Sequence, residues 1–366
     1  IAGCVAQAEN NEMIKREPYI DIVIGPQAYH KINNTILNYL KKRKRKEETD
    51  FDTLLKFDYF DKIKNNNNKI SSFLTIQEGC DKFCKFCVVP YTRGPECSRS
   101  FLEIISEAKQ LANNGVKEII LLGQNVNAYS NKSKRLSDLI YSINDIKEIK
   151  RIRYTTSHPK DFTNDLIDVH SNCEKLMPLL HLPIQSGSTK ILKSMNRGHT
   201  IEEYINTIDS LKKKKTNIKF SSDFIIAYPG ETKNDFLKTL DLFKKVKFIN
   251  SYSFIFSPRP GTPASSLKKI DSEIAKERLR VFQKTANSIK TNYRSSLINS
   301  SAKVLFENKI KNQDQYFGRD EYFNSVIVNS NIDLSGKLRE VKINECNQNT
   351  LFGELVLNKE YKEFAA

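Results

Sequence analysis

The sequence holds 366 residues, of which 39% are hydrophobic and 28% are charged, with a formal net charge of +16. This composition is typical of a globular protein of two or three domains, and it excludes an intrinsically disordered chain. The positive charge favours a polyanionic partner such as nucleic acid, although runs rich in lysine and asparagine offer a compositional explanation for part of it.

Targeting signals and cysteine usage suggest a compartment. No run of about 20 apolar residues occurs and no signal peptide is recognisable, so we expect no membrane partner. Seven cysteines, three of them clustered, favour metal binding in a reducing compartment over a disulfide framework. We therefore expect a cytoplasmic protein. Because the chain begins at Ile1 with the pattern of a buried strand end, we also expect further sequence upstream.

Residues 1–48 are predicted to be the remnant of an α/β domain. The run KKRKRK then breaks the apolar pattern, and we interpret it as a solvated segment rather than a nucleic-acid patch. Residues 49–69 are predicted to form a linker. After the strand end IAGCVAQ, the predicted elements are a helix over 8–18, a strand over 20–25 and a helix over 29–40.

Residues 70–298 are predicted to form β/α units around a parallel sheet, because short apolar runs alternate there with amphipathic stretches. Six such runs are fewer than a complete eight-unit barrel needs, so we expect a partial (β/α)6 barrel. The predicted strands cover 73–77, 118–123, 151–156, 179–184, 220–228 and 251–256. The predicted helices cover 101–115, 135–146, 232–246 and, as a long polar helix, 271–298.

Residues 300–366 change to a period of two, which predicts a small antiparallel β-barrel of a kind that often binds oligonucleotides. Gly318, Gly336 and Gly353 are interpreted as breaks between strands. The predicted strands cover 302–310, 324–330, 338–347 and 351–357.

Cys80, Cys84 and Cys87 follow the first predicted strand as C-x3-C-x2-C. Three thiolates on one loop can each hold a different iron of a cubane cluster and leave the fourth iron open to a substrate. Structural zinc, completed by Cys97 or a histidine, is the alternative. The position after a barrel strand favours the cluster, because active sites gather at the carboxyl ends of such strands.

Polar residues follow four other predicted strands, and their convergence at one mouth would suit a polar cofactor. For any one of them, a cap or loop role is the alternative. They are Gln124, Asn125, Asn127, Ser157, His158, Gln185, Ser186, Gly187 and Glu231. Loop arginines that could bind phosphate or carboxylate are Arg93, Arg99 and Arg259. Cysteines interpreted as ordinary small residues are Cys97, Cys173 and Cys346.

The cysteine loop, with Phe86 before its last cysteine, resembles the radical S-adenosylmethionine superfamily. Motifs between residues 70 and 265 are similar to those of the tRNA methylthiotransferases: TRGPECSR, LLGQNVNAY, RIRYTTSHP, LHLPIQSGS, MNRGHTIEEY, SDFIIAYPGET and FSPRPGTPA. LLGQNVNAY and RGHTIEEY resemble the branch that acts on isopentenyl-adenosine. They differ from the branches that act on threonylcarbamoyl-adenosine or on an aspartate of a ribosomal protein.

The resemblance implies a [4Fe-4S] cluster on Cys80, Cys84 and Cys87, with S-adenosylmethionine on the open iron. One-electron reduction would give a 5′-deoxyadenosyl radical that activates C2 of the adenine, and a second S-adenosylmethionine would methylate the inserted sulfur. The residues expected to bind the cofactor are Phe86, Gln124, Asn125, Ser157, Gln185, Ser186 and Glu231.

The resemblance also implies an auxiliary [4Fe-4S] cluster. Cys4, in GCVAQ, matches one of its three ligands, and the other two would lie upstream of Ile1. We expect the present chain to generate the radical without completing methylthiolation. Residues 1–48 then correspond to the end of the family's N-terminal methylthiotransferase domain, and residues 300–366 to its OB-like TRAM domain.

The implied partner is a tRNA anticodon stem-loop. Phe317, Tyr322 and Phe323 are candidates for stacking on its bases, with an ordinary place in the barrel core as the alternative. We expect a monomer that receives electrons from a flavodoxin or ferredoxin. The hypothesis from another class is a non-catalytic RNA-binding protein with structural zinc.

Overall fold

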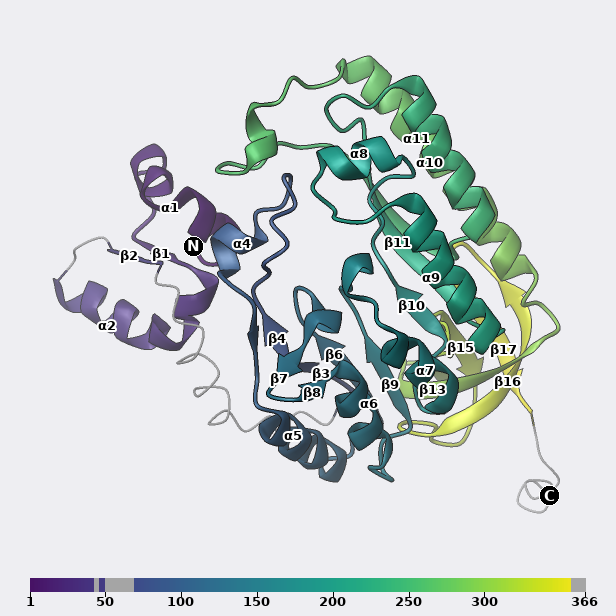
Figure 1. Ribbon diagram of the computed structural model, residues 1–366. Coiled ribbons are helices and arrows are strands. Elements are labelled where there is room, and N and C mark those ends of the chain that lie inside the picture. Colours follow the sequence, from purple (N-terminus) through teal and green to yellow (C-terminus); the bar gives the residue numbers. More distant parts are fainter. Residues whose placement is uncertain (43–45, 50–68, 357–366) are drawn as a thin grey trace.

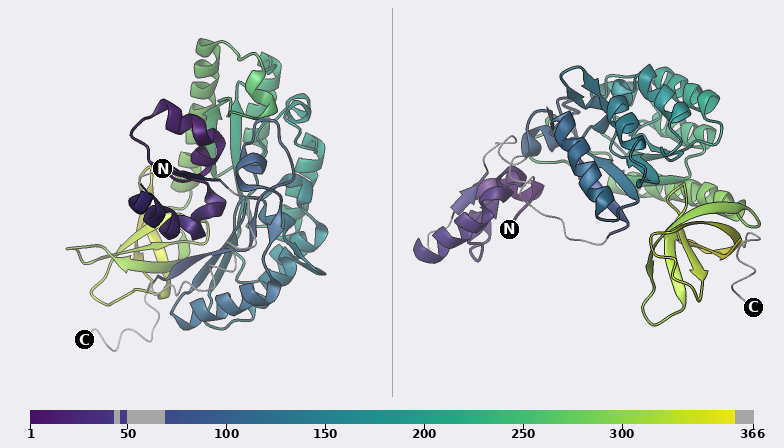
Figure 2. Two further views of the ribbon diagram at one scale, coloured as in Figure 1. Left: turned by 90° about the vertical axis from the view of Figure 1, so that its left-hand side faces the viewer. Right: turned by 90° about the horizontal axis from the view of Figure 1, so that it is seen from below.

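The computed structural model describes residues 1–42, 46–49 and 69–356, which form three parts (Figures 1 and 2). A small α/β part holds the N-terminus, parallel strands with helices on one side form the centre, and a β-barrel follows. Residues 43–45 of the basic run and most of the predicted linker lie outside the described residues. Within the described ranges, every helix is too short or too polar to cross a membrane.

The N-terminal part confirms the predicted order of strand and helix. Ala2 bridges Ile24, and β1 pairs in parallel with β2. Its buried core is formed by Ala6, Met13, Ile20 and Val23. The elements are α1 (Cys4–Arg16), β1 (Ile22–Ile24), the 3-10 helix η1 (Pro26–Lys31), α2 (Ile32–Lys42) and β2 (Lys46–Glu48).

In the central part, all six predicted strands are present, in two three-stranded parallel sheets. A parallel bridge between Ile152 and Leu176 lies between the two sheets. The first sheet has the order β3 (Ser71–Thr75), β6 (Glu118–Leu122) and β9 (Arg151–Tyr154). The second has the order β10 (Leu179–His181), β11 (Lys219–Ile226) and β12 (Asn250–Ile255).

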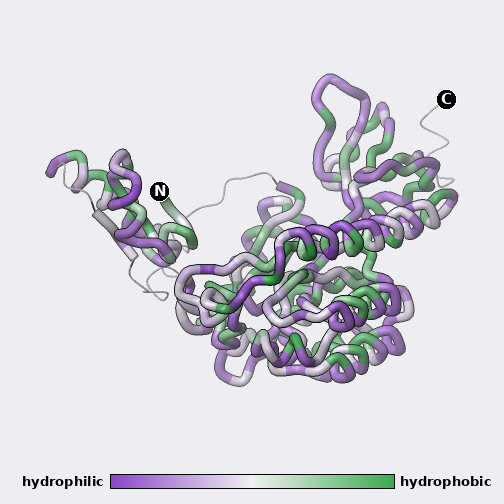
Figure 3. The backbone as a smooth tube through the Cα atoms, turned by 90° about the horizontal axis from the view of Figure 1, so that it is seen from above, coloured by the Kyte–Doolittle hydropathy of each residue, from purple (hydrophilic) through white to green (hydrophobic). Residues whose placement is uncertain are grey.

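Helices between these strands cover one face of the sheets (Figure 1). They are α5 (Phe101–Asn113), α6 (Leu136–Asn144), α7 (Asn164–Asn172), α8 (Thr189–Ser194), α9 (Ile201–Lys214) and α10 (Lys233–Val246). The long helix α11 (Ser272–Ser295) confirms the predicted polar helix, and in Figure 3 hydrophilic and hydrophobic segments alternate along its length. Shorter elements are β4 (Gln77–Glu78), α4 (Val89–Arg93), β5 (Cys97–Ser98), η2 (Val126–Ala128), β7 (Ser130–Asn131), β8 (Lys134–Arg135), η3 (Pro159–Asp161) and η4 (Pro263–Ser266).

The main hydrophobic core lies between the sheets and these helices. On β11, Phe224 is fully buried, and its ring centroid lies 5.4 Å from that of Phe243 on α10 and 4.8 Å from that of Phe282 on α11. Burying such a ring contributes about 2–3 kcal/mol, so the aromatic cluster holds both helices against the strand. Phe224 thus lies on the face of the strand that packs against α10 and α11.

The C-terminal barrel is closed, in the order β13, β14, β15, β17, β16. The prediction of a purely antiparallel barrel was wrong for one pair, because β15 and β17 run parallel. A ring with an odd number of strands cannot alternate direction throughout, so one neighbouring pair must be parallel. The strands are β13 (Ser301–Lys309), β14 (Gln315–Arg319), β15 (Ser325–Asn329), β16 (Leu338–Cys346) and β17 (Thr350–Leu355).

Two barrel glycines had been misinterpreted as breaks. Gly318 lies within β14, a strand that was not predicted, and Gly353 lies within β17. A Cβ on Gly318 would come within 2.6 Å of the Leu305 carbonyl oxygen, and one on Gly353 within 2.2 Å of the Lys342 carbonyl oxygen. Glycine therefore permits a close approach of strands at these positions. Gly336, with φ +72°, does lie in a turn.

Two buried arginines of β9 attach the barrel to the central part. Arg151 donates to the carbonyl oxygens of Lys303, Arg319 and Asp320 at 2.6, 2.7 and 3.3 Å. Arg153 donates to the Glu118 carboxylate at 2.9 Å and also to the Asp320 carbonyl oxygen at 2.9 Å. Burial lowers the pKa of Arg151 to about 10, and the surrounding carbonyls supply its hydrogen bonds.

Candidate active site

The three clustered cysteines lie on the loop between β4 and α4. The Cys80 amide donates to the Gly94 carbonyl oxygen at 3.2 Å, and the Cys87 amide donates to the Cys84 carbonyl oxygen at 2.9 Å. Cys84 is buried, whereas Cys80 and Cys87 are half-buried. Backbone hydrogen bonds therefore fix the loop that carries all three thiols.

The entry to this loop depends on Gly79. Its φ is +76°, and a Cβ there would lie 1.8 Å from the Pro95 carbonyl oxygen, so only glycine fits. Its amide donates to Oε1 of Gln124, a predicted cofactor-binding residue, at 2.8 Å. The buried Gln77 accepts from the amides of Gln124 and Asn125 at 3.0 and 3.1 Å. The loop is thereby joined to the carboxyl end of β6.

Asn125 belongs to a polar network beside the loop. Its Nδ2 donates to Glu96 at 3.0 Å and to Asp161 at 2.7 Å, and Asp161 also accepts from Lys82 at 2.8 Å. Asn127 exchanges two hydrogen bonds of 2.8 Å with the backbone of His158. The residues predicted at the ends of β6 and β9 are thus brought together.

The Cys84 sulfur has two nitrogen-bearing neighbours. Arg197, 6% exposed, donates from Nη1 to Sγ at 3.4 Å and from Nη2 to the Pro183 carbonyl oxygen at 2.6 Å. The Nε2 atom of His158 lies 3.9 Å from the same sulfur. Burial, with Arg197 nearby, lowers the pKa of His158 far below its ordinary value, so this imidazole is neutral.

Arg197 was not singled out from the sequence, although it stands in the motif MNRGHTIEEY. Its neighbour Gly198 has φ +65°, and the side chain is buried. A charged residue directly before a glycine within a family motif is the signal that could have identified it.

Phe86 packs against the second sheet. It lies half-buried against a cluster formed by Ile191, Met195, Tyr228, Phe256 and Ala264. The adjacent Lys85 donates its amide to the Met195 carbonyl oxygen and accepts from the Ala264 amide, both at 2.9 Å. The aromatic residue before the last cysteine therefore anchors the loop to the other half of the site.

Three predicted cofactor residues occupy positions near the second sheet. Gln185 has φ +76° and bridges Phe224. Ser186 is buried with Oγ 3.5 Å from Thr239 Oγ1 on α10. Glu231 is 4% exposed and accepts from Arg278 at 2.7 Å; burial raises its pKa despite that partner. Ser186 and Glu231 thus make structural contacts to helices.

Cys4 lies close to the cysteine loop, although it is far away in the sequence. Arg93, in the helix that follows Cys87, donates from Nε to the Cys4 sulfur at 3.3 Å. The Arg93 carbonyl oxygen accepts from Gln27 at 2.8 Å, which further attaches the N-terminal part to α4. Among the described residues, Cys4 forms no disulfide.

The donor set suits an iron–sulfur cluster with a polar ligand. Buried polar atoms close to the loop lack a hydrogen-bond partner within the described part of the chain: Asn125 Oδ1, Ser157 Oγ and Arg197 Nε. Burial raises the pKa of Cys80 to about 12 and also raises that of Cys87, so apolar surroundings favour these thiols as neutral groups until a cation pairs with them. In the described ranges, no three His, Cys, Asp or Glu side chains are grouped as ligands for a single metal ion.

The remaining candidates are placed elsewhere. Arg99 is buried and pairs with Glu107 at 2.8 Å, whereas Arg259 is exposed. Cys173 is buried and donates to Asn144. Cys97 pairs with Glu78 in the β4–β5 ladder, and Cys346 packs at the barrel core.

Two of the three aromatic residues predicted to stack on bases, Tyr322 and Phe323, contact the central part. Tyr322 donates to the Asn217 carbonyl oxygen at 2.9 Å. Phe323 lies under the guanidinium groups of Arg153 and Arg319, at 4.9 and 4.3 Å, and Arg319 also lies 5.2 Å from the Phe317 ring. Tyr322 and Phe323 therefore make contacts at the attachment of the barrel.

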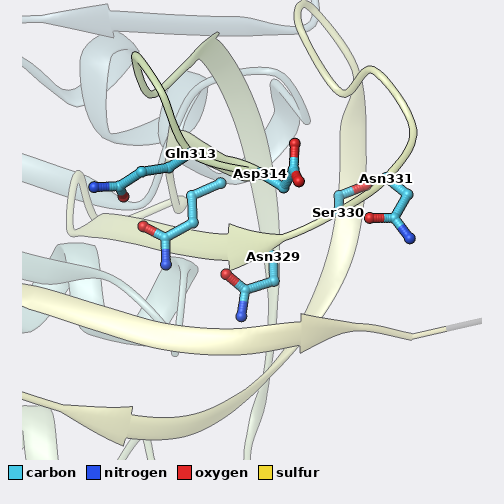
Figure 4. A pocket seen from close by; sticks show the side chains of 6 residues that line it. Gln313, Asp314, Asn329, Ser330 and Asn331 are labelled. Carbon is cyan, nitrogen blue, oxygen red and sulfur yellow. The ribbon is translucent and has the colours of Figure 1, made fainter.

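A cavity of about 450 Å³ lies at the open end of the β14–β15 hairpin, where the chain enters β14 and leaves β15 (Figure 4). Its lining is polar, with Gln313, Asp314 and Asn329 among the side chains that surround it. It includes none of the predicted site residues.

Comparison with known proteins identifies the family. Residues 74–243 match the Radical SAM superfamily. The tRNA-2-methylthio-N(6)-dimethylallyladenosine synthase of Pelagibacter ubique (strain HTCC1062) is 60% identical, over 99% of this chain and 82% of the relative. The protein of that name from Rickettsia bellii (strain RML369-C) is 48% identical, over 97% and 81%.

Among solved structures, the cobalamin-dependent S-adenosylmethionine radical enzyme OxsB is similar with a TM-score of 0.48 and 14% identity, over 80% of this chain and 43% of that chain. The family assignment rests on the sequence relatives, whose identity extends over nearly the whole chain. The chain belongs to the tRNA-2-methylthio-N(6)-dimethylallyladenosine synthases of the radical S-adenosylmethionine superfamily.

Proposed function

We propose that this chain is a tRNA methylthiotransferase that converts N6-isopentenyladenosine beside the anticodon to its 2-methylthio derivative. The observation that carries the proposal is the loop with Cys80, Cys84 and Cys87, fixed by backbone hydrogen bonds in a chain 60% identical to a synthase of that name. The family match favours this function over the two alternatives, which are a methylthiotransferase acting on a ribosomal protein and a non-catalytic RNA-binding protein with structural zinc.

Cys80, Cys84 and Cys87 would hold a [4Fe-4S] cluster. With S-adenosylmethionine bound, that cluster supplies one-electron cleavage and a 5′-deoxyadenosyl radical. Asn125 and Ser157 present buried, unpaired oxygens that we assign to hydrogen bonds with the cofactor.

The other predicted cofactor residues divide into two groups. Gln124 positions the cysteine loop through Gly79, and Phe86 packs beneath it. Gln185, Ser186 and Glu231 shape the opposite wall, where Arg278 holds the Glu231 carboxylate. We propose that this second group positions the backbone around the cofactor and makes no charged contact with the cofactor itself.

Cys4 is proposed as a ligand of a second, auxiliary [4Fe-4S] cluster. Its 3.3 Å contact with Arg93 supports the proposal, because Arg93 follows the cysteine loop by six residues. Because two further ligands are expected upstream, the test compares iron and sulfide in the reconstituted full-length protein with those in its Cys4→Ala variant; equal iron contents would count against the proposal.

At the level of the fold, we propose that the two parallel sheets form one partial (β/α)6 barrel over residues 70–298. The bridge between Ile152 and Leu176 supports this continuity. Residues 300–366 are proposed to be the OB-like TRAM domain that binds RNA, and the closed barrel supports it. Residues 1–48 are proposed to belong to the methylthiotransferase domain, joined through the linker 49–69.

The partners follow from this chemistry. The RNA is proposed to be an anticodon stem-loop, and electrons are proposed to come from a flavodoxin or ferredoxin. We further propose that the enzyme acts as a monomer in the cytoplasm, where tRNA is modified.

Deuterium transfer tests the substrate. An anticodon stem-loop with N6-isopentenyladenosine deuterated at C2 is incubated with reconstituted protein, S-adenosylmethionine and a reductant. The proposal predicts deuterium in the 5′-deoxyadenosine, measured by mass spectrometry. It also predicts none when the C2-deuterated adenosine carries threonylcarbamoyl instead. Equal transfer from both RNAs, or transfer from neither, would contradict the assigned substrate.

A further inference from the structure

Two large aromatic side chains are exposed on the edge strand β12. Tyr252 is 53% exposed and Phe254 is 61% exposed, although both lie inside a regular strand. A neighbouring pair of exposed rings is costly in water and is typical of a binding surface.

The register with β11 shows which face they occupy. Tyr252 pairs with Asp223 and Phe254 pairs with Ile225 in the parallel ladder, so each pair lies on the same face. The alternate residue Phe224 is fully buried against the helices. Tyr252 and Phe254 therefore lie on the face of the strands opposite to Phe224, and at this sheet edge they line a pocket together with residues of α11 such as Ala286.

This face continues to the cysteine loop. Phe256, the next residue of the same alternation, is buried in the cluster against which Phe86 packs. Ile225, the partner of Phe254, also packs against that cluster. An apolar surface thus runs from Tyr252 along β12 to the residue before the last cysteine.

The other side of Tyr252 is polar. Its ring lies edge-on to that of His181, with centroids 6.3 Å apart. The Nδ1 atom of His181 lies 2.9 Å from Ser221 Oγ, and Nε2 lies 3.5 Å from the Asp223 carboxylate. The surface therefore combines two exposed rings with a fixed carboxylate.

We propose that Tyr252 and Phe254 form the subsite for the dimethylallyl group of the substrate adenosine. The inference rests on the proposed function and specifies how the site selects among modified adenosines. A branched five-carbon chain matches two exposed rings, whereas the carboxylate of a threonylcarbamoyl group would meet apolar rings and the Asp223 charge. Binding is thereby favoured for the apolar modification and opposed for the anionic one.

The test measures the affinity of the reconstituted protein for anticodon stem-loops that carry either N6-isopentenyladenosine or unmodified adenosine. Burial of the five-carbon group predicts about tenfold tighter binding of the modified RNA. In Phe254→Ala or Tyr252→Ala this preference should fall to about twofold, while Phe254→Leu should keep most of it. Tyr141→Ala, at an aromatic residue 39% exposed on α6, is the matched control and should keep the full preference.

The outcomes separate the two proposals. Loss of the preference in the alanine variants, with unchanged affinity for the unmodified RNA, supports the subsite. A full preference in Phe254→Ala, or none in the wild type, overturns the subsite and leaves the tRNA assignment standing. Failure of the wild type to bind either RNA contradicts the proposed function itself. Because both rings are exposed, the variants should fold, and Phe254→Leu provides the comparison if an alanine variant does not.

Discussion

Arg197 is the buried cation beside Cys84, one of the three residues proposed to hold the cluster. It reaches the Cys84 sulfur at 3.4 Å while a second nitrogen is held by the Pro183 carbonyl oxygen at 2.6 Å. A buried cation beside a cluster ligand stabilises added negative charge, so it should make reduction easier. Arg197 is therefore a positioning and electrostatic residue for the cluster.

The variant Arg197→Met should lower the reduction potential of the cluster. If the guanidinium stabilises the reduced cluster over the oxidised one by about 1 kcal/mol, its removal lowers the potential by about 40 mV for one electron. Redox titration followed by electron paramagnetic resonance measures this, with exposed Lys193→Met as the control. An unchanged potential in Arg197→Met would show that the guanidinium only packs against the loop.

At the scale of elements, the capping of α10 explains why the wall containing Ser186 is rigid. Asp235 accepts from Ser188 Oγ and Thr232 Oγ1, both at 2.7 Å, so one carboxylate joins the helix start to the loop after β10. Burial alone would raise the pKa of Asp235, but these hydrogen bonds hold it well below its ordinary value. The charged form is therefore stabilised in the folded state.

Replacing Asp235 should destabilise the protein and change its acid sensitivity. Asp235→Ala should cost about 2 kcal/mol, because it removes a cap and leaves Ser188 without its partner. A depressed folded pKa contributes stability above the unfolded value of 3.8, and that contribution is lost as pH falls below it. Urea unfolding at pH 7 and at pH 3 measures both effects. The same loss at pH 7 in exposed Asp241→Ala would refute the capping explanation.

Local patterns predicted most strands and the cysteine loop, because alternation and spacing are properties of adjacent residues. The role of Glu231 could not be predicted, since its partner Arg278 lies 47 residues away. Strand β14 was missed because Gly318 resembles a break in the sequence, and its need for glycine depends on Leu305 of the neighbouring strand. Long-range partners decided each of these cases.

At the scale of the whole molecule, buried arginines attach the barrel to the central part. Arg151 and Arg153 donate to backbone carbonyl groups of β13 and of the β14–β15 turn. At the far end of α11, Arg294 donates to the carbonyl oxygens of Asn347 and Asn349 at 3.1 and 3.2 Å. These contacts set the orientation of the barrel relative to the central part.

The variant Arg151→Met should loosen the barrel. Three carbonyl acceptors lose a charged donor, so we expect the free energy of unfolding to fall by about 3 kcal/mol. The barrel should then unfold in a separate transition at a lower temperature than the central part. Calorimetry and limited proteolysis between residues 296 and 303 would detect it. Arg280→Met, at an exposed arginine of α11, should behave as the wild type. One unchanged, cooperative transition in Arg151→Met would contradict the attachment described here.

One measurement tests most directly whether the cysteine loop holds the cluster that cleaves S-adenosylmethionine. Reconstituted wild-type protein and Cys84→Ala are each incubated anaerobically with S-adenosylmethionine and a reductant, and 5′-deoxyadenosine is quantified. We expect formation by the wild type and none above background by Cys84→Ala, because this buried thiol is proposed as a ligand of the cluster. Undiminished 5′-deoxyadenosine formation by the variant would contradict it.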